Sequence, residues 1–191
     1  MEEKMIKPWK VMSSRYLAEK PWFTVREERV QLPNGNEIPN YYVFEYPDWV
    51  NVIAVTRDGK FVFERQYRHA VGLVSYELCA GVCEPDDASP LESARRELLE
   101  ETGYGNGEWE ELMILSPNPG THTNLTYCYL ARNVERIESQ HLEPRVAFSR
   151  RGAGFARLQR GVAGFACRTT VEIYLYVVGR KNLIFAARCL L

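Results

Sequence analysis

A single strong helix signal stands among segments that read as β-strands, and this contrast most constrains the fold. Ser89-Pro90-Leu91-Glu92 is a capping box: the Ser hydroxyl can accept from the third helical amide, the Glu can reach back to the Ser amide, and Pro occupies the first helical position. Gly103 supplies the left-handed residue that usually ends a helix. Between these ends, Leu91, Ala94 and Leu98 recur at helical spacing, which predicts their face as the core face.

Turn signals divide much of the remaining chain into strands. Asn-Gly takes a positive φ at little cost, so the segment 33–36 predicts a hairpin, and Asp58-Gly59 predicts a second one. The expected strands are residues 22–32, 37–46, 50–56, 61–67, 75–79, 111–115 and 125–131. Strands with one helix predict a protein that contains both α and β structure.

Length and composition fit a globular protein. The chain has 191 residues, of which 46% are hydrophobic and 26% charged, and it has no apolar run of about 18 residues, so a disordered chain and a membrane protein are both disfavoured. Its start carries charges of both signs and lacks the apolar stretch of a signal peptide, which predicts a cytoplasmic location and no membrane partner. The five cysteines form no Cys-x-x-Cys pair and favour reduced, packed thiols over a zinc site or a disulfide framework.

Three glutamates in the helix carry the strongest chemical signal. Glu97, Glu100 and Glu101 are spaced i, i+3, i+4 and therefore converge on one side of the helix. Clustered carboxylates repel one another unless a cation holds them, and oxygen ligands favour Mg²⁺, Mn²⁺ or Ca²⁺ over zinc. The alternative is a solvated, glutamate-rich helix face.

The residues around these glutamates resemble the Nudix box, G-x5-E-x7-R-E-U-x-E-E-x-G-U, where U is aliphatic or aromatic. Residues 96–104, Arg-Glu-Leu-Leu-Glu-Glu-Thr-Gly-Tyr, match its second half fully. The first half begins at Gly81 but departs from the pattern, because Asp87 stands in place of Glu and eight residues instead of seven separate it from Arg96. The extra residue falls in a loop before the helix, where an insertion is tolerated.

Segments outside the box are similar to ADP-ribose and nucleoside-diphosphate-sugar pyrophosphatases of the Nudix superfamily. They are 64–68 (Glu-Arg-Gln-Tyr-Arg), 77–81 (Glu-Leu-Cys-Ala-Gly) and 119–123 (Pro-Gly-Thr-His-Thr), and the similarity spans roughly residues 10–143. The resemblance implies an α/β fold of the α+β type with a mixed sheet between helices. This is the Nudix fold, an α/β/α sandwich, here with an N-terminal antiparallel hairpin extension. It also implies a homodimer.

The resemblance assigns roles residue by residue. The implied metal ligands for Mg²⁺, with Mn²⁺ as a possible substitute, are Glu97, Glu100, Glu101 and the carbonyl of Ala80. Arg96 precedes Glu100 by four residues and can orient its carboxylate. The implied substrate contacts are Arg68 and Glu77, at the pyrophosphate and the terminal sugar, and Trp22 and Tyr41, around the base.

The implied reaction is hydrolysis of the pyrophosphate of a nucleoside diphosphate linked to another group, with ADP-ribose giving AMP and ribose 5-phosphate. Two alternatives stay open. One is another Nudix pyrophosphatase, acting on GDP-mannose, a dinucleotide or coenzyme A. The other is a non-catalytic domain that binds nucleotide sugars.

The last part of the chain changes character. Residues 1–144 have a net charge of −9, whereas residues 145–191 have +8 and contain a single acidic residue, Glu172. We therefore divide the chain into a hairpin region (1–48), a Nudix core (49–144) and an anomalous basic segment (145–191), which we interpret as an out-of-frame translation. The alternative is a divergent extension with a strand at 169–178. The arginines are scattered, so nucleic-acid binding is not expected.

Overall fold

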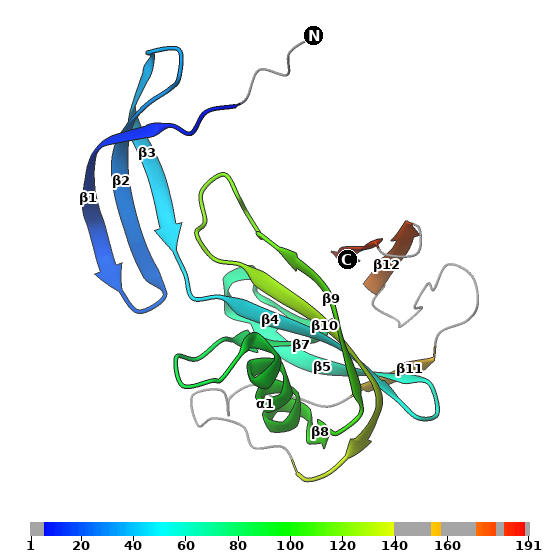
Figure 1. The fold of residues 1–191 in the computed structure, drawn as a ribbon. Helices are drawn as coiled ribbons and strands as arrows, with labels where there is room; N and C mark the ends of the chain where they lie inside the picture. The colour runs from blue at the N-terminus through cyan, green and yellow to red at the C-terminus, as the bar shows by residue number, and fades with distance from the viewer. Residues whose placement is uncertain (1–5, 140–153, 158–170, 179–181, 190–191) are drawn as a thin grey trace. The chain divides into compact units, whose positions relative to one another are not determined.

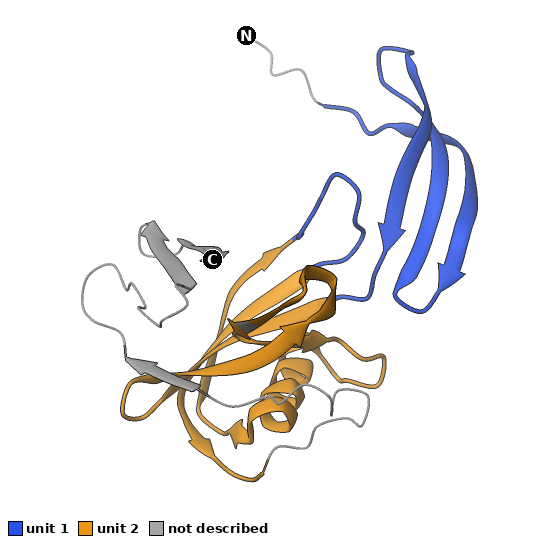
Figure 2. Ribbon diagram, turned by 180° about the vertical axis from the view of Figure 1, so that it is seen from behind, with its two compact units in different colours: residues 1–48, 116–125 blue, residues 49–115, 126–191 orange. Residues whose placement is uncertain are grey.

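The computed structural model describes residues 6–139, 154–157, 171–178 and 182–189. The chain forms two compact units, coloured separately in Figure 2. The first comprises residues 1–48 and 116–125, and the second comprises residues 49–115 and 126–191. Within the described ranges, no helix is long and apolar enough to cross a membrane.

The first unit is a three-stranded antiparallel sheet of β1 (Lys10–Lys20), β2 (Phe23–Gln31) and β3 (Glu37–Glu45) (Figure 1). The predicted turn joins β2 to β3: Gly35 has a φ of 87°, and the Asn36 amide donates to Asn34 Oδ1 at 3.0 Å. The sequence did not predict β1. Ten of its eleven residues are exposed, so no buried face imposes the alternation of apolar and polar residues by which a strand is found in a sequence.

A loop from later in the chain completes the first unit. The Phe44 amide donates to the Thr121 carbonyl at 2.8 Å, and the Thr123 amide donates back to the Phe44 carbonyl at 3.1 Å. The Leu125 amide donates to Asp48 Oδ1 at 2.7 Å. These bonds attach residues 116–125 to the end of β3.

The second unit is built around a mixed eight-stranded sheet (Figure 1). Its main path runs β11-β5-β4-β10-β8, with β6 beside β5, β7 beside β4 and β9 beside β10. The strands are β4 (Trp49–Thr56), β5 (Lys60–Arg68), β6 (Leu73–Glu77), β7 (Cys79–Val82), β8 (Tyr104–Gly105), β9 (Glu108–Leu115), β10 (Thr126–Arg136) and β11 (Gly154–Arg157). The β4–β10 pair is parallel and the other pairs are antiparallel.

Two expectations about strands are refined. The segment predicted as one strand at 75–79 is divided at Leu78 between β6, which pairs with β5, and β7, which pairs with β4. A short 3-10 helix, η1 (His69–Val71), precedes β6. In the basic segment, β12 (Val171–Val178) pairs with β13 (Asn182–Cys189), whereas residues 169–170 of the predicted strand lie outside the described residues.

The predicted helix is α1 (Pro90–Thr102), with Ser89 as its N-cap and Gly103, at φ 74°, as its C-cap. Its core face is also confirmed: Ala94 and Leu98 are fully buried, and Leu91 packs against the same cluster. The main core cluster lies between α1 and the sheet and includes Val50, Val52, Ala54, Val62, Tyr129 and Val134. The mixed α/β architecture is therefore confirmed, while the second helical layer of the expected sandwich is not among the described residues.

Candidate active site

The three glutamates of α1 differ in their surroundings. Glu101 is 8% exposed, and the side chain of Glu97 is 13% exposed, whereas 45% of the Glu100 side chain remains accessible. Helical spacing correctly placed them on one side of α1, but the sheet covers that side unevenly. Two carboxylates are therefore largely removed from water, and the third lies at the edge of the site.

Arg96 connects this helix to the preceding loop. Its guanidinium donates to both carboxylate oxygens of Asp87, at 3.1 and 2.8 Å, and to the Val82 carbonyl at 2.9 Å. It also donates to Glu97 at 3.0 Å and to Glu100 at 3.3 Å. The expected pair with Glu100 is present, but the bidentate contact with Asp87 has the better geometry for fixing the guanidinium.

Asp87 is the position at which the sequence departs from the Nudix box, and the structure shows how the departure is accommodated. The extra residue in the loop still lets the shorter side chain reach Arg96. The Glu84 amide donates to the same carboxylate at 3.1 Å. Hydrogen bonds from Arg96 hold the pKa of Asp87 well below its usual range, so this carboxylate stays ionised and paired at neutral pH.

Gly81 in β7 makes room for Glu97. A Cβ at this position would lie 1.9 Å from Cδ of Glu97, much closer than atoms in contact can approach. The Glu97 carboxylate therefore lies against the β7 backbone at Gly81, the residue that follows Ala80. Only glycine leaves this space, which gives a packing reason for the first residue of the box.

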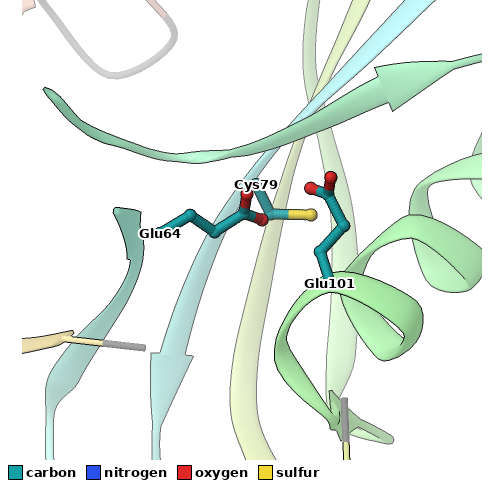
Figure 3. Close-up of side chains that lie close together, drawn as sticks. All are labelled: Glu64, Cys79 and Glu101. Atoms are coloured by element: carbon teal, nitrogen blue, oxygen red, sulfur yellow. The ribbon is translucent and has the colours of Figure 1, made fainter. Parts of the chain in front are cut away.

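A buried cluster beneath the C-terminal half of α1 was not predicted from the sequence. Glu64 of β5, Cys79 of β7 and Glu101 of α1 are all buried, with their potential ligand atoms within 4.8 Å of one another, and Figure 3 shows their polar ends directed together. A sequence signal for Glu64 did exist: it directly follows Phe61-Val62-Phe63, where a buried strand continues. An acidic residue in such a position is rare unless it is paired or functional.

Burial and like charge raise the affinity of this region for protons. The pKa of Glu97 is raised, mainly by burial and then by the neighbouring Glu101. The pKa of the Cys79 thiol is raised well above its ordinary value by burial and by Glu64 and Glu101, and its thiol is hydrogen-bonded to Glu64. A divalent cation would stabilise the charged carboxylates, and their oxygens are the ligands that Mg²⁺ prefers, so the residues present fit such an ion.

Arg68 and Glu77 are brought together by the β5–β6 pair. Nε of Arg68 donates to both Glu77 carboxylate oxygens, at 3.0 and 2.9 Å. The pKa of Arg68 is raised, chiefly by this hydrogen bonding, and the negative charges of Glu101 and Glu64 contribute in the same direction. The guanidinium therefore carries its charge near the buried carboxylates, with half of its side chain exposed.

Trp22 and Tyr41 belong to the first unit, and the structure does not bring them together. Trp22 lies in the β1–β2 turn and is 63% exposed. This turn lies just beyond the Thr24–Glu45 pair, at the C-terminal end of β3. Tyr41 lies further along β3, where its hydroxyl donates to the Gly120 carbonyl and its ring meets Trp9 edge-on at 5.7 Å. Tyr41 therefore holds the loop 116–125 against the sheet.

Comparisons with known proteins divide the chain at nearly the same place as the two units. Residues 9–44 match the nucleoside diphosphate sugar hydrolase N-terminal domain, and residues 45–150 match the NUDIX domain. A solved structure described as an ADP compounds hydrolase superposes with a TM-score of 0.67, covering 79% of this chain and 80% of that one, at 21% identity. At that identity the likeness shows the fold.

Three curated relatives are similar over most of the chain. An ADP-ribose pyrophosphatase of Mycobacterium tuberculosis is 33% identical over 71% of this chain and 66% of its own length. An ADP-ribose pyrophosphatase of Bacillus subtilis is 29% identical over 73% and 71%, respectively. A methanol dehydrogenase activator of Bacillus methanolicus is 32% identical over 72% and 70%.

The helix with its three glutamates, the Arg96 contacts and the glycine against Glu97 thus occur in a chain of which more than half matches one domain family. The Nudix resemblance drawn from the sequence is confirmed, including its likeness to ADP-ribose pyrophosphatases. The chain belongs to the Nudix family and is a Nudix hydrolase.

Proposed function

We propose that this protein hydrolyses the pyrophosphate bond of ADP-ribose in a Mg²⁺-dependent reaction, giving AMP and ribose 5-phosphate. The observation that carries the proposal is the group of carboxylates between α1 and β7, in which Glu97 and Glu101 are largely buried and Glu100 lies at the rim. A domain that only bound a nucleotide sugar would not need such a concentration of buried negative charge.

Each residue has a distinct role in this proposal. Glu97, Glu100, Glu101 and the Ala80 carbonyl would hold Mg²⁺, which neutralises charge on the phosphate oxygens when bound. Arg96 orients Glu97 and Glu100, since it donates to both while Asp87 fixes its position. Arg68 would exchange part of its contact with Glu77 for a phosphate oxygen. Water adds to one phosphorus, the P–O bond of the bridge breaks, and each product keeps one phosphate.

The preference for ADP-ribose is supported by the relatives that are ADP-ribose pyrophosphatases and by the N-terminal domain match. We propose that Trp22 and Tyr41 contribute to recognition of the base. Trp22 is displayed by a turn in which it adopts a φ of 64°, a costly conformation for a bulky residue. Such strain is retained more readily where the side chain has a use.

We further propose that the protein is a homodimer. The first unit exposes several large apolar side chains, as expected of a surface covered by a second copy. They include Trp9, Val11, Tyr16, Leu17, Trp22 and Phe23, each at least 47% exposed. Sedimentation equilibrium should give a mass near 44 kDa, about twice the 22.1 kDa of one chain. A monomer at all concentrations would contradict this part of the proposal.

The experiment that tests the function is product analysis by mass spectrometry. The purified chain is incubated with Mg²⁺ and ADP-ribose, GDP-mannose, UDP-glucose, diadenosine polyphosphate or NADH, beside Glu101→Gln. Glu92→Gln is a matched control, because Glu92 lies on the same helix but is exposed and paired with Arg95. We expect AMP from ADP-ribose with the parent chain and Glu92→Gln, and a rate lower by about 10² to 10³ with Glu101→Gln.

Other outcomes are informative as well. Release of a different nucleoside monophosphate would keep the hydrolase and change the substrate. A folded chain that binds ADP-ribose but turns over none of these compounds would overturn the proposal in favour of a non-catalytic binding domain. Activity that survives chelation of divalent cations would contradict the role given to the carboxylates.

A further inference from the structure

Glu64, Cys79 and Glu101 form a compact donor set at the inner end of the candidate active site. They come from three different elements, β5, β7 and α1, and are only 4%, 1% and 8% exposed. Their potential ligand atoms lie within 4.8 Å of one another, and in Figure 3 the Cys79 sulfur lies between the two carboxylates. Removing carboxylates from water is costly, and the positive charge of Arg68 offsets part of this cost at Glu64 and Glu101. A cation bound between the two carboxylates and the thiol would add to that stabilisation.

Cys128 provides an internal comparison, because it is also a buried thiol, at 3% exposure. Its hydrogen-bond partner is the neutral side-chain amide of Asn51. Ordinary packing accounts for such a cysteine. Cys79 instead has Glu64 as its hydrogen-bond partner and Glu101 as a near neighbour. Its surroundings are those of a ligand rather than those of a small apolar side chain.

The donor chemistry indicates the class of ion. Mg²⁺ takes oxygen ligands, whereas a sulfur ligand shifts preference toward more thiophilic divalent ions such as Zn²⁺ and Co²⁺. One sulfur with two carboxylate oxygens therefore differs from the all-oxygen set of Glu97, Glu100 and the Ala80 carbonyl. The two sets adjoin each other through Glu101, which was assigned above to the Mg²⁺ site.

We propose that Glu64, Cys79 and Glu101 form a second, inner position for a thiophilic divalent cation, whose occupation withdraws Glu101 from the Mg²⁺ site. When such an ion binds, a sulfur–metal bond forms and the thiol proton passes to solvent, with no change of oxidation state. The inhibitory consequence rests on the proposed hydrolase function, whereas the binding itself does not. Zn²⁺ would thus slow hydrolysis by competing for a shared carboxylate.

The test of binding is a titration of the metal-free, full-length chain with Co²⁺, followed by near-ultraviolet absorption, where thiolate–Co²⁺ charge transfer appears. We expect this band in the parent chain and in Cys128→Ser, and its loss in Cys79→Ser. Glu64→Gln should weaken Co²⁺ binding at least about tenfold. Glu110→Gln, an exposed strand glutamate paired with Arg132, should leave it unchanged.

Two results would overturn the inference: a folded parent chain without a thiolate band, or a band that persists in Cys79→Ser. Spectra of the parent and of Cys128→Ser show whether a thiolate band forms, even if a Cys79 variant does not fold. The inhibitory role is tested by comparing, within each variant, hydrolysis with Mg²⁺ alone and with added Zn²⁺. If added Zn²⁺ slows hydrolysis by Cys79→Ser as much as it slows hydrolysis by the parent, the inhibitory role is contradicted. A Cys79-dependent band in a chain without hydrolysis would retain the inner site and reject the proposed function.

Discussion

The two units of the chain use charged residues in opposite ways. In the sheet of the first unit, arginines of β2 face glutamates of β3: Arg26 meets Glu45, and Arg29 meets Glu37. In the second unit, Glu64 and Glu101 are buried and Glu97 is largely buried, and Glu101 lies near both of the others. Charges that pair across strands match the register of a sheet, whereas buried charges of one sign oppose folding and indicate chemistry.

This contrast predicts which charge-removing variants should affect stability and which should affect hydrolysis. Removing a charge from the first unit should cost a little stability and no hydrolysis. Removing one from the buried cluster should cost hydrolysis, and in the absence of cations it should cost little or no stability. The following variants test this separation.

Gly81→Ala should have a large effect on hydrolysis and a small one on stability. The new Cβ would occupy the position of the Glu97 carboxylate, which is the flexible end of a side chain and can move away. Because a displacement of about 1 Å at a reacting centre can cost about a hundredfold, hydrolysis should fall by about that factor. Thermal unfolding should change little. Gly120→Ala is the control, since its nearest atom would be 3.5 Å away, and equal losses in both variants would contradict this explanation.

Asp87→Asn should have an intermediate effect, on stability and activity together. It weakens the bidentate contact that fixes Arg96, and a hydrogen bond to a charged group contributes about 1.5 to 3 kcal/mol. The folded pKa of Asp87 lies below its ordinary value of 3.8, so its stabilising contribution is present at neutral pH and is lost as the pH falls below that value. Denaturation at pH 7 and pH 3 should show a difference between parent and variant that shrinks in acid.

Glu97→Gln should change stability in the opposite direction. The folded pKa of Glu97 lies above its ordinary value of 4.5, so the folded state binds more protons and is destabilised as the pH rises through this range. Without divalent cations, the variant should therefore be at least as stable as the parent at pH 7, while hydrolysis is lost. A variant that is clearly less stable would show that the hydrogen bond from Arg96 outweighs the cost of burying the Glu97 charge.

Arg29→Gln should have the smallest effect. The Arg29–Glu37 pair is exposed, at 53% and 33% of the two side chains, and pairs of this kind contribute less than about 1 kcal/mol. Urea denaturation at low and high salt should show a difference that salt reduces further, and ADP-ribose hydrolysis should match the parent. A loss of hydrolysis would mean that the first unit's charge pairs serve the reaction directly.

Much of the candidate site could be predicted because it lies in one helix. Cap residues, helical spacing and the order of Arg96, Glu97, Glu100 and Glu101 are local properties, and the predicted helix and its core face are confirmed. Glu64 and Cys79 could not be assigned this way, because they reach Glu101 only through the pairing of β5, β4 and β7. The spacing of these residues in the sequence does not predict that contact.

The basic segment shows the same limit. The interpretation of residues 145–191 as an out-of-frame translation stays a prediction. Intact-mass analysis of the natural protein tests it, since a mass equal to that of these 191 residues would refute it. Charge composition can flag such a segment, but it does not say how the segment folds.

The sequence by itself determined the helix, the hairpin turn, the family and the three clustered glutamates, because capping, turn conformation and helical periodicity act over a few residues. Tertiary structure alone decided which glutamates lose contact with water, how Asp87 reaches Arg96, and that a thiol and a strand carboxylate join Glu101. Burial and charge proximity depend on strands far apart in the chain, and these two quantities set the affinity of a carboxylate for protons and cations.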